Sequence, residues 1–209
     1  MTASSARRAR ESKRRAKALA TQRPGPLRMF FKGFMKRPVM VGAIVPSSRV
    51  VISRVLKPVD WANTKLFVEY GPGVGTFCQP ILDRLVPDAT LLVIDTNPDF
   101  IGYLRETIAD PRFVAVEGSA ADVASIIAEH GFAHADYVLS GLPFSTLPKG
   151  VGAAIGQATY DVLRPGGAFL VYQYTPKCRQ FIAPYFERID HGMEILNIPP
   201  AQLYWAWKE

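Results

Sequence analysis

Short apolar runs alternate with amphipathic stretches along most of this chain of 209 residues. Seven runs have the length and the content of branched and aromatic residues that are typical of buried strands. They lie at residues 66–70, 91–95, 113–116, 137–140, 168–174, 188–196 and 202–207. Helical patterns are found at residues 49–56, 77–85, 98–108, 123–130, 151–162 and 178–185. Regular alternation of strand and helix predicts an α/β domain with a doubly wound parallel sheet, covered by helices on both faces.

Several residues mark where the expected helices and strands begin. Ser47 and Asp122 are placed to cap the helices that follow them, and Asn97 precedes a helix whose first position is Pro98. Residues 163–167 are expected to form a tight turn into the strand at 168–174. Ligands of such sheets bind beyond the carboxyl ends of the strands. The ligand-binding and catalytic residues are therefore expected in the segments that follow each strand.

The amino-terminal end has a different pattern. Residues 7–19 form a basic helical stretch, residues 23–26 break it, and residues 27–37 are expected to form an amphipathic helix. At 100° per residue, five bulky apolar side chains of this helix fall within one arc of about 140°. These are Leu27, Phe30, Phe31, Phe34 and Met35, and Arg28, Lys32 and Lys36 lie beside them. This composition is typical of a helix at an anionic membrane surface, and packing against the protein's own domain is the alternative.

Charge divides the chain at the same place. The whole chain carries a formal net charge of +7. Residues 1–38 contain 12 Lys and Arg and one acid, Glu11, hence +11, whereas residues 39–209 contain 13 basic and 17 acidic residues, hence −4. We therefore expect a basic, membrane-binding helical extension over residues 1–38 and a mildly acidic globular domain over residues 39–209.

The sequence lacks an apolar run of membrane-spanning length and a secretory signal at its start. Cys78 and Cys178 lie far apart, and His130, His134 and His191 form no ligand pattern, so neither a disulfide nor a metal site is expected. These features predict a cytoplasmic protein that associates peripherally with the cytoplasmic face of the inner membrane. The pattern does not indicate an oligomeric state.

The glycine-rich segment after the first strand carries the clearest chemical signal. Gly71, Gly73 and Gly75 let the backbone turn tightly and approach a ligand. Asp95 ends the next strand, where a carboxylate can accept hydrogen bonds from a ribose diol. A dinucleotide fingerprint would need glycine at position 76, which is Thr, and the carboxylate of Glu69 suits a cationic ligand better than a pyrophosphate.

This segment resembles motif I of the class I S-adenosylmethionine (SAM) methyltransferases. The resemblance implies SAM as methyl donor, S-adenosylhomocysteine as product, and no metal. It also implies that the corner at residues 118–122 lies against the adenine ring. The residues expected to bind the cofactor are Glu69, Tyr70, Gly71, Gly73, Gly75, Asp95, Thr96, Ser119, Ala120 and Ser140.

The segment Ser140-Gly141-Leu142-Pro143-Phe144 looks like the Asn-Pro-Pro-Tyr or Asn-Leu-Pro-Tyr motif of amino-group methyltransferases. In that motif a side-chain oxygen at the first position and the carbonyl before the proline accept hydrogen bonds from an amine, and the aromatic ring stabilises the acceptor. Ser140 stands in place of Asn, which favours an aliphatic amine over adenine. The catalytic candidates are Ser140, Phe144 and Tyr174, with Tyr172 an alternative to Tyr174 as proton relay.

Blocks at residues 42–48, 69–75, 140–148 and 197–201 together resemble the bacterial SAM-dependent phospholipid N-methyltransferases. The resemblance implies a seven-stranded, Rossmann-like sheet whose last strand is antiparallel. It also implies three successive methylations that convert phosphatidylethanolamine to phosphatidylcholine. Lys36, Arg37 and Lys177 are candidates for binding the lipid phosphate.

Three alternatives to this function stay open. One is an adenine N-methyltransferase that acts on RNA, although the Ser at position 140 and the Phe-rich extension argue against a nucleic-acid partner. Another is methylation of a different amine lipid, such as an ornithine lipid. The third is a membrane-surface protein that has a SAM pocket but no activity.

Overall fold

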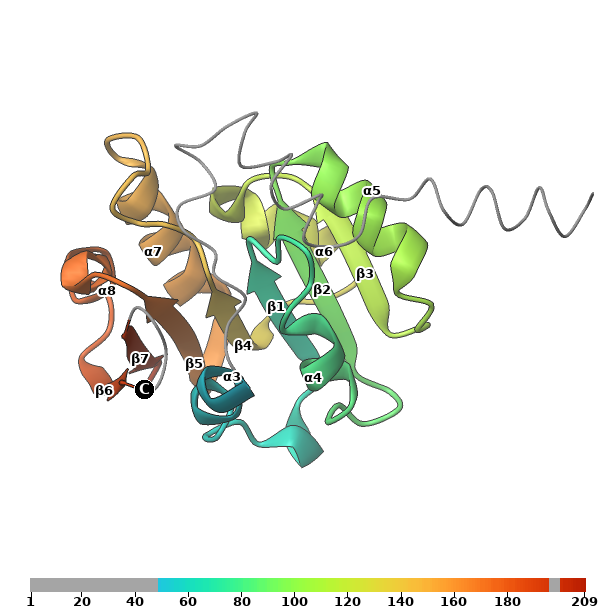
Figure 1. Cartoon of the computed structure of the whole chain (residues 1–209), viewed down its shortest axis with the longest axis horizontal. Coiled ribbons are helices and arrows are strands. Elements are labelled where there is room, and N and C mark those ends of the chain that lie inside the picture. Colours follow the sequence, from blue (N-terminus) through green and yellow to red (C-terminus); the bar gives the residue numbers. More distant parts are fainter. Residues whose placement is uncertain (1–48, 196–199) are drawn as a thin grey trace, which may run out of the picture.

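The structure is a computed structural model that describes residues 49–195 and 200–209 (Figure 1). The expected extension over residues 1–38, its amphipathic helix at 27–37 and the cap at Ser47 lie outside the described residues. The blocks at 42–48 and 197–199 also lie outside them. These expectations therefore stay predictions.

In the described part of the chain, seven strands form one sheet in the order β3-β2-β1-β4-β5-β7-β6. Their bounds are β1 Leu66–Tyr70, β2 Thr90–Asp95, β3 Phe113–Glu117, β4 Ala135–Ser140, β5 Leu163–Gln173, β6 Arg188–Glu194 and β7 Ala201–Trp207. The first five strands pair in parallel, whereas β7 runs antiparallel to both β5 and β6. The predicted Rossmann-like sheet with an antiparallel last strand is thus confirmed.

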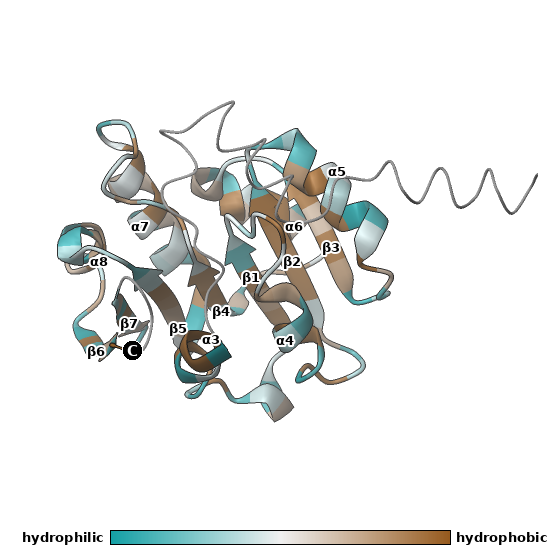
Figure 2. Cartoon of the chain, in the orientation of Figure 1, coloured by the Kyte–Doolittle hydropathy of each residue, from teal (hydrophilic) through white to brown (hydrophobic). Residues whose placement is uncertain are grey.

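Helices cover both faces of the sheet (Figure 1). The helices α3 (Arg49–Val55), α4 (Cys78–Leu82) and α5 (Pro98–Thr107) pack on one face. The helices α6 (Val123–Glu129), α7 (Val151–Val162) and α8 (Arg179–Ile182) pack on the other. Short 3-10 turns lie at η1 (Trp61–Asn63), η2 (Ala120–Asp122) and η3 (Pro176–Cys178). Figure 2 shows the apolar central strands between these two layers, as expected for strands that are buried on both faces.

The pleat of β1 sends alternate side chains into two separate cores. Phe67 joins the core under α3, α4 and α5, whereas Val68 and Tyr70 join the core under α6, α7 and α8. At the amino ends of the strands, the carboxylate of Asp136 accepts hydrogen bonds from the backbone N–H groups of Lys65 (2.7 Å) and Leu66 (2.9 Å). Asp136 also pairs with Arg164 at the start of β5. This one carboxylate therefore ties β1, β4 and β5 together.

Several helix and strand boundaries differ from the sequence prediction. Residues 163–167 belong to β5 rather than to a turn, because Leu163 pairs with Ala135 and the backbone of Gly166 and Gly167 bonds to that of Lys208. The helix expected at residues 178–185 is only the turn η3 and α8. Pro184 lies two residues after α8 and has no N–H with which to continue it.

The predicted caps have mixed outcomes. Asn97 caps α5 as expected, since its side chain accepts a 3.0 Å hydrogen bond from Asp99 N. The prediction that Asp122 caps α6 is wrong, because its side chain makes no capping hydrogen bond. The turn η2 precedes α6, and Ser119 caps that turn by accepting a 3.2 Å bond from Ala121 N.

Candidate active site at the carboxyl ends of the strands

The segments that follow β1, β3 and β4 are each held against the end of a neighbouring strand by a backbone hydrogen bond. Gly71 N donates to Ile94 O (2.9 Å), Gly118 N to Asp95 O (3.0 Å), and Gly141 N to Tyr70 O (3.2 Å). Because parallel strands end at the same edge, these bonds bring the glycine loop, Asp95 and the segment after β4 to one edge of the sheet.

The loop after β1 has a backbone that favours glycine at each of its three glycine positions. Gly71, Gly73 and Gly75 have φ angles of +64°, +56° and +81°. Space excludes a side chain as well, because a Cβ at Gly71 would lie 2.8 Å from Leu142 Cδ2 and a Cβ at Gly75 would lie 2.6 Å from Leu104 Cδ2. Of these three glycines, Gly71 and Gly73 line the cavity at this edge of the sheet, so no side chain faces it at those two positions.

A cavity of about 240 Å³ opens at this edge. Six of the predicted cofactor residues line it: Gly71, Gly73, Asp95, Thr96, Ser119 and Ala120. Leu142, Pro143 and Ile155 contribute apolar wall on another side. The cavity thus combines a glycine cradle, one carboxylate and apolar surface, which fits the ribose and the adenine of SAM.

Among the described residues that line this cavity, Asp95 is the charged one. Its Oδ1 accepts a 2.9 Å hydrogen bond from Asn97 N, which orients the carboxylate. Burial raises the pKa of Asp95 to about 6, and hydrogen bonds from the backbone of Asn97, Gly73 and Thr96 act in the opposite direction. Its position at the end of β2 suits a carboxylate that accepts hydrogen bonds from the two ribose hydroxyls.

Glu69 lies behind the cavity wall, between β1 and α4. It is 2% exposed, and Cys78 Sγ donates a 3.4 Å hydrogen bond to its Oε2. Burial raises the pKa of Glu69 to about 8; the Cys78 bond lowers it, and the charge of Asp95 raises it further. Burial also raises the pKa of the Cys78 thiol. A cation at the glycine loop would favour the ionised form of Glu69, so the site is suited to a positively charged ligand.

Tyr70 contributes only its backbone to this edge of the sheet. Its ring lies in the opposite core, where its hydroxyl accepts a 3.3 Å hydrogen bond from Thr159 Oγ1 and its edge meets Phe169. The side chain therefore points away from the cavity. The pleat explains this, because Glu69 and Tyr70 are consecutive and must face opposite sides.

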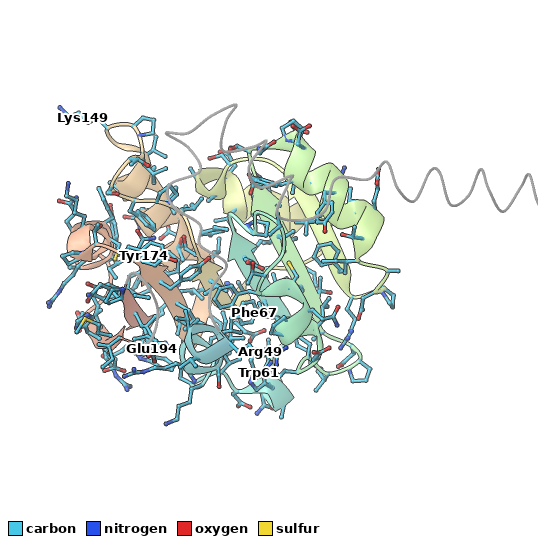
Figure 3. All side chains as sticks on the ribbon, in the orientation of Figure 1. Arg49, Trp61, Phe67, Lys149, Tyr174 and Glu194 are labelled. Carbon is cyan, nitrogen blue, oxygen red and sulfur yellow. The ribbon has the colours of Figure 1, made fainter. Side chains whose placement is uncertain are left out.

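The structure does not bring the three catalytic candidates to the cavity wall. Ser140 is fully buried, and its Oγ accepts a 3.2 Å bond from Leu142 N. Phe144 is 2% exposed and stacks on Phe181, with ring centroids 5.7 Å apart. Tyr174 is partly buried just past the end of β5 (Figure 3), packed on the core under α3, α4 and α5.

The residues that do line the wall after β4 are Gly141, Leu142 and Pro143. A different alignment of the sequence motif would have found them. When the segment is aligned on Leu142-Pro143-Phe144, Gly141 rather than Ser140 occupies the first position. Reasoning from the sequence also missed Asn97, Phe100, Val151 and Ile155, which reach the cavity from α5, α7 and the turn before α5.

Within residues 49–195 and 200–209, no group of three or more His, Cys, Asp and Glu side chains is arranged to hold a metal ion. Among the helices of those same residues, none is long and apolar enough to cross a membrane.

Comparison with known proteins gives one extensive sequence match. The chain is 32% identical over 180 residues to the ornithine lipid N-methyltransferase of Singulisphaera acidiphila, covering 85% of this chain and 94% of that protein. The ribosomal RNA small subunit methyltransferase H of Halorhodospira halophila is 32% identical over 98 residues, but this match covers 46% of the chain and 27% of that protein. No family model matches the chain.

Solved structures share the fold at low sequence identity. The precorrin-6y C5,15-methyltransferase of Geobacter metallireducens superposes with a TM-score of 0.63 at 15% identity, covering 80% of this chain and 93% of that one. The N-methyltransferase NodS of Bradyrhizobium japonicum, solved with S-adenosylhomocysteine, gives 0.59 at 13% identity, covering 76% and 84%. Together with the glycine loop, Asp95 and the near full-length match, these likenesses assign the chain. It is a class I SAM-dependent methyltransferase and belongs to the family that includes the ornithine lipid N-methyltransferase of S. acidiphila.

Proposed function

We propose that this methyltransferase transfers methyl groups from SAM to the free amine of an ornithine lipid at a membrane surface. The observation that carries the proposal is the 32% identity to an ornithine lipid N-methyltransferase along 94% of that protein's length. The main expectation from the sequence was phosphatidylethanolamine. The relative supports ornithine lipid better, which the sequence reading held as an alternative.

The two lipids offer the site similar chemistry. Each ends in a primary amine on a short alkyl arm next to an anion, which is a carboxylate in ornithine lipid and a phosphodiester in phosphatidylethanolamine. When bound, SAM supplies an activated methyl group on a sulfonium, and its leaving group is a neutral thioether. The protein therefore has to position the nitrogen, keep water out and hold the amine neutral. A free alkylamine has a pKa near 10.4, and a desolvated site lowers it.

We propose that the amino-terminal extension binds the membrane and so brings the enzyme to its lipid substrate. Residues 27–37 combine five bulky apolar side chains with Arg28, Lys32 and Lys36. Basic side chains near an anionic surface contribute about 1 kcal/mol each. We place the enzyme peripherally on the cytoplasmic face of the inner membrane, where both SAM and lipid are within reach.

The acceptor is tested with purified full-length protein and SAM labelled on its methyl group. Separate reactions contain phosphatidylglycerol vesicles with ornithine lipid, the same vesicles with phosphatidylethanolamine, and ribosomal RNA. The expected result is label in ornithine lipid, which is lost when Asp95 is replaced by Ala. Label in phosphatidylethanolamine alone would restore the first expectation. Label only in RNA would overturn the lipid proposal and favour the partial match to the ribosomal RNA enzyme.

Membrane association is tested separately, by sedimentation of the protein with anionic vesicles. Replacing Arg28, Lys32 and Lys36 together by Gln should weaken binding roughly 10²-fold, since three contributions of about 1 kcal/mol are lost. Lys57→Gln, which removes an exposed charge after α3, is the control and should bind as the wild type does. Equal binding by the triple variant would refute the role of this helix.

A further inference from the structure

The mouth of the cavity has two rims, and a lipid substrate requires one of them to touch the membrane. The amine of an ornithine lipid sits on a short alkyl arm, while its acyl chains stay in the bilayer. The cavity that fits SAM lies at the carboxyl ends of the strands. The headgroup can therefore reach it only if one rim lies against the bilayer surface. The two rims differ in charge.

The first rim is acidic. It is formed by the segments after β2 and β3, where Thr96, Ser119 and Ala120 line the cavity. Residues 95–122 contain six acidic and two basic residues, hence −4. Glu117 and Asp122 are exposed beside this rim. A surface of this sign is repelled by anionic lipid headgroups.

The second rim is the loop at residues 145–150, between β4 and α7. Thr146, Leu147 and Pro148 line the cavity, and Lys149 follows them at an exposed tip, where it points away from the protein (Figure 3). Residues 141–186 contain four basic residues and one acid, hence +3. That acid is Asp161, which lies at the far end of α7 from the loop and accepts a 2.9 Å hydrogen bond from Gln157.

The helix α8 extends this second rim, because it packs directly on the start of α7 (Figure 1). Phe181 of α8 stacks on Phe144, which precedes the loop, with ring centroids 5.7 Å apart. Glycine at positions 152 and 156 of α7 makes this close approach possible. A Cβ at Gly152 would lie 2.9 Å from Phe181 Cδ1, and one at Gly156 would lie 2.1 Å from Phe181 O. The loop, α7 and α8 therefore form one continuous surface.

Three cations lie on this surface. Lys149 comes from the loop, Lys177 from η3 and Arg179 from α8, and all three are exposed. None of the ion pairs among the described residues includes them. Lys177 was a candidate from the sequence for binding the lipid phosphate. Their charges are thus available to an anionic partner outside the protein.

We propose that this basic rim, which consists of the loop at residues 145–150, η3 and α8, docks on the anionic surface of the membrane. The inference rests on the proposed function, which requires the cavity to reach a lipid. The rim is a second contact, distinct from the extension at residues 27–37. The extension holds the enzyme at the bilayer, and the charge difference between the two rims turns the cavity toward the headgroups.

The orientation is tested with a fluorescent probe on each rim of the full-length protein. Cys78 and Cys178 are buried, so a cysteine introduced at the surface can be labelled selectively. Gln180→Cys on α8 and Ala124→Cys beside the acidic rim both replace exposed, neutral residues. Each is labelled with a dye whose emission shifts to the blue in apolar surroundings. Vesicles of phosphatidylglycerol should shift the dye at position 180 and leave the dye at position 124 unchanged.

The charges are tested by replacing Lys149, Lys177 and Arg179 together by Gln. The apparent KM for ornithine lipid in phosphatidylglycerol vesicles should rise roughly 10²-fold, since each basic side chain at an anionic surface contributes roughly five-fold in binding. The dissociation constant for SAM should stay that of the wild type. The matched control replaces three other exposed cations by Gln, in the segments that lead into β1 and β2 at the amino ends of the strands. These are Lys57, Lys65 and Arg84, and their loss should leave this KM unchanged.

The two proposals fail in different experiments. The proposed function is refuted if the wild type methylates no amine lipid. The docking of the basic rim is refuted if the dye at position 124 shifts as much as the dye at position 180, or if neither shifts, and these vesicles contain no ornithine lipid. Equal KM values for the two triple variants would also refute it, because the position of the charges would then have no effect.

Discussion

Replacement of Glu69 by Gln should stabilise the ligand-free protein, and by an amount that depends on pH. Burial raises the pKa of Glu69 from 4.5 to about 8. Between these values the folded protein keeps a proton that the unfolded chain releases, so the free energy of unfolding falls as pH rises. Gln removes this dependence because it is neutral in both states.

The magnitude follows from the two pKa values. Each pH unit above 4.5 lowers the free energy of unfolding of the wild type by about 1.4 kcal/mol, until the pKa of Glu69 in the folded protein, near 8, is reached. Glu69→Gln should thus be nearly neutral at pH 4.5, stabilising by about 3 kcal/mol at pH 7, and stabilising by about 5 kcal/mol above pH 8. For a chain of this length, 3 kcal/mol corresponds to roughly 10 °C in Tm.

The assay is urea unfolding of the full chain at pH 5, 7 and 8.5, followed by circular dichroism. Glu117→Gln is the control, because Glu117 is exposed at the end of β3. SAM should raise the Tm of the wild type more than that of Glu69→Gln, since its positive charges favour the ionised carboxylate. A stability difference that stays constant from pH 5 to 8.5 would refute the assigned pKa and its cause.

Three further outcomes are expected from other parts of the fold. The affinity for SAM should fall as pH drops below about 6, because Asp95 takes up a proton there. Titration calorimetry should show that Asp95→Asn binds SAM weakly and that its affinity does not depend on pH in this range. Gly75→Ala should cost about 2–4 kcal/mol of unfolding free energy, because its φ is +81° and its Cβ would lie 2.6 Å from a side chain. Gly131→Ala has a similar φ of +83° but open space, so its loss of only about 1 kcal/mol would isolate the steric part. Asp136→Ala should cost about 2–4 kcal/mol in the same assay, because two backbone N–H groups lose their partner. Asp88→Ala breaks an exposed ion pair with Lys65 and should change the free energy of unfolding by less than about 1 kcal/mol. Equal losses for Asp136→Ala and Asp88→Ala would contradict the account of Asp136.

Local sequence was enough to predict the sheet, and to predict that the glycine loop and Asp95 lie together at the carboxyl ends of the strands. The run Leu66–Tyr70 is apolar apart from Glu69 because the strand is buried on both faces, and the match with the observed bounds is complete there. The glycine loop and Asp95 were predicted because their chemistry depends on the backbone and on position at a strand end. Neither requires knowledge of a distant contact.

The remainder of the site depends on contacts between segments that are far apart in the sequence. Tyr172 reaches Gly141 across two neighbouring strands, and nothing local to either residue reveals this. Ser140 and Phe144 were assigned to the acceptor from motif position, but the pleat and the stacking on Phe181 turn them into the protein. Side-chain direction at the end of a strand could therefore not be predicted from the sequence, and the catalytic roles of these residues stay predictions.

The position of Asp136 has a consequence for how this family can diversify. It joins three strands at their amino ends, while the cavity that we assign to the methyl donor lies at the opposite ends of the same strands. Substitutions at the carboxyl ends of β4 and β5 can therefore accumulate without weakening the contacts of Asp136 that hold these strands in register. Residues that determine stability and residues that determine acceptor preference can thus change independently, because they lie at opposite ends of the same strands.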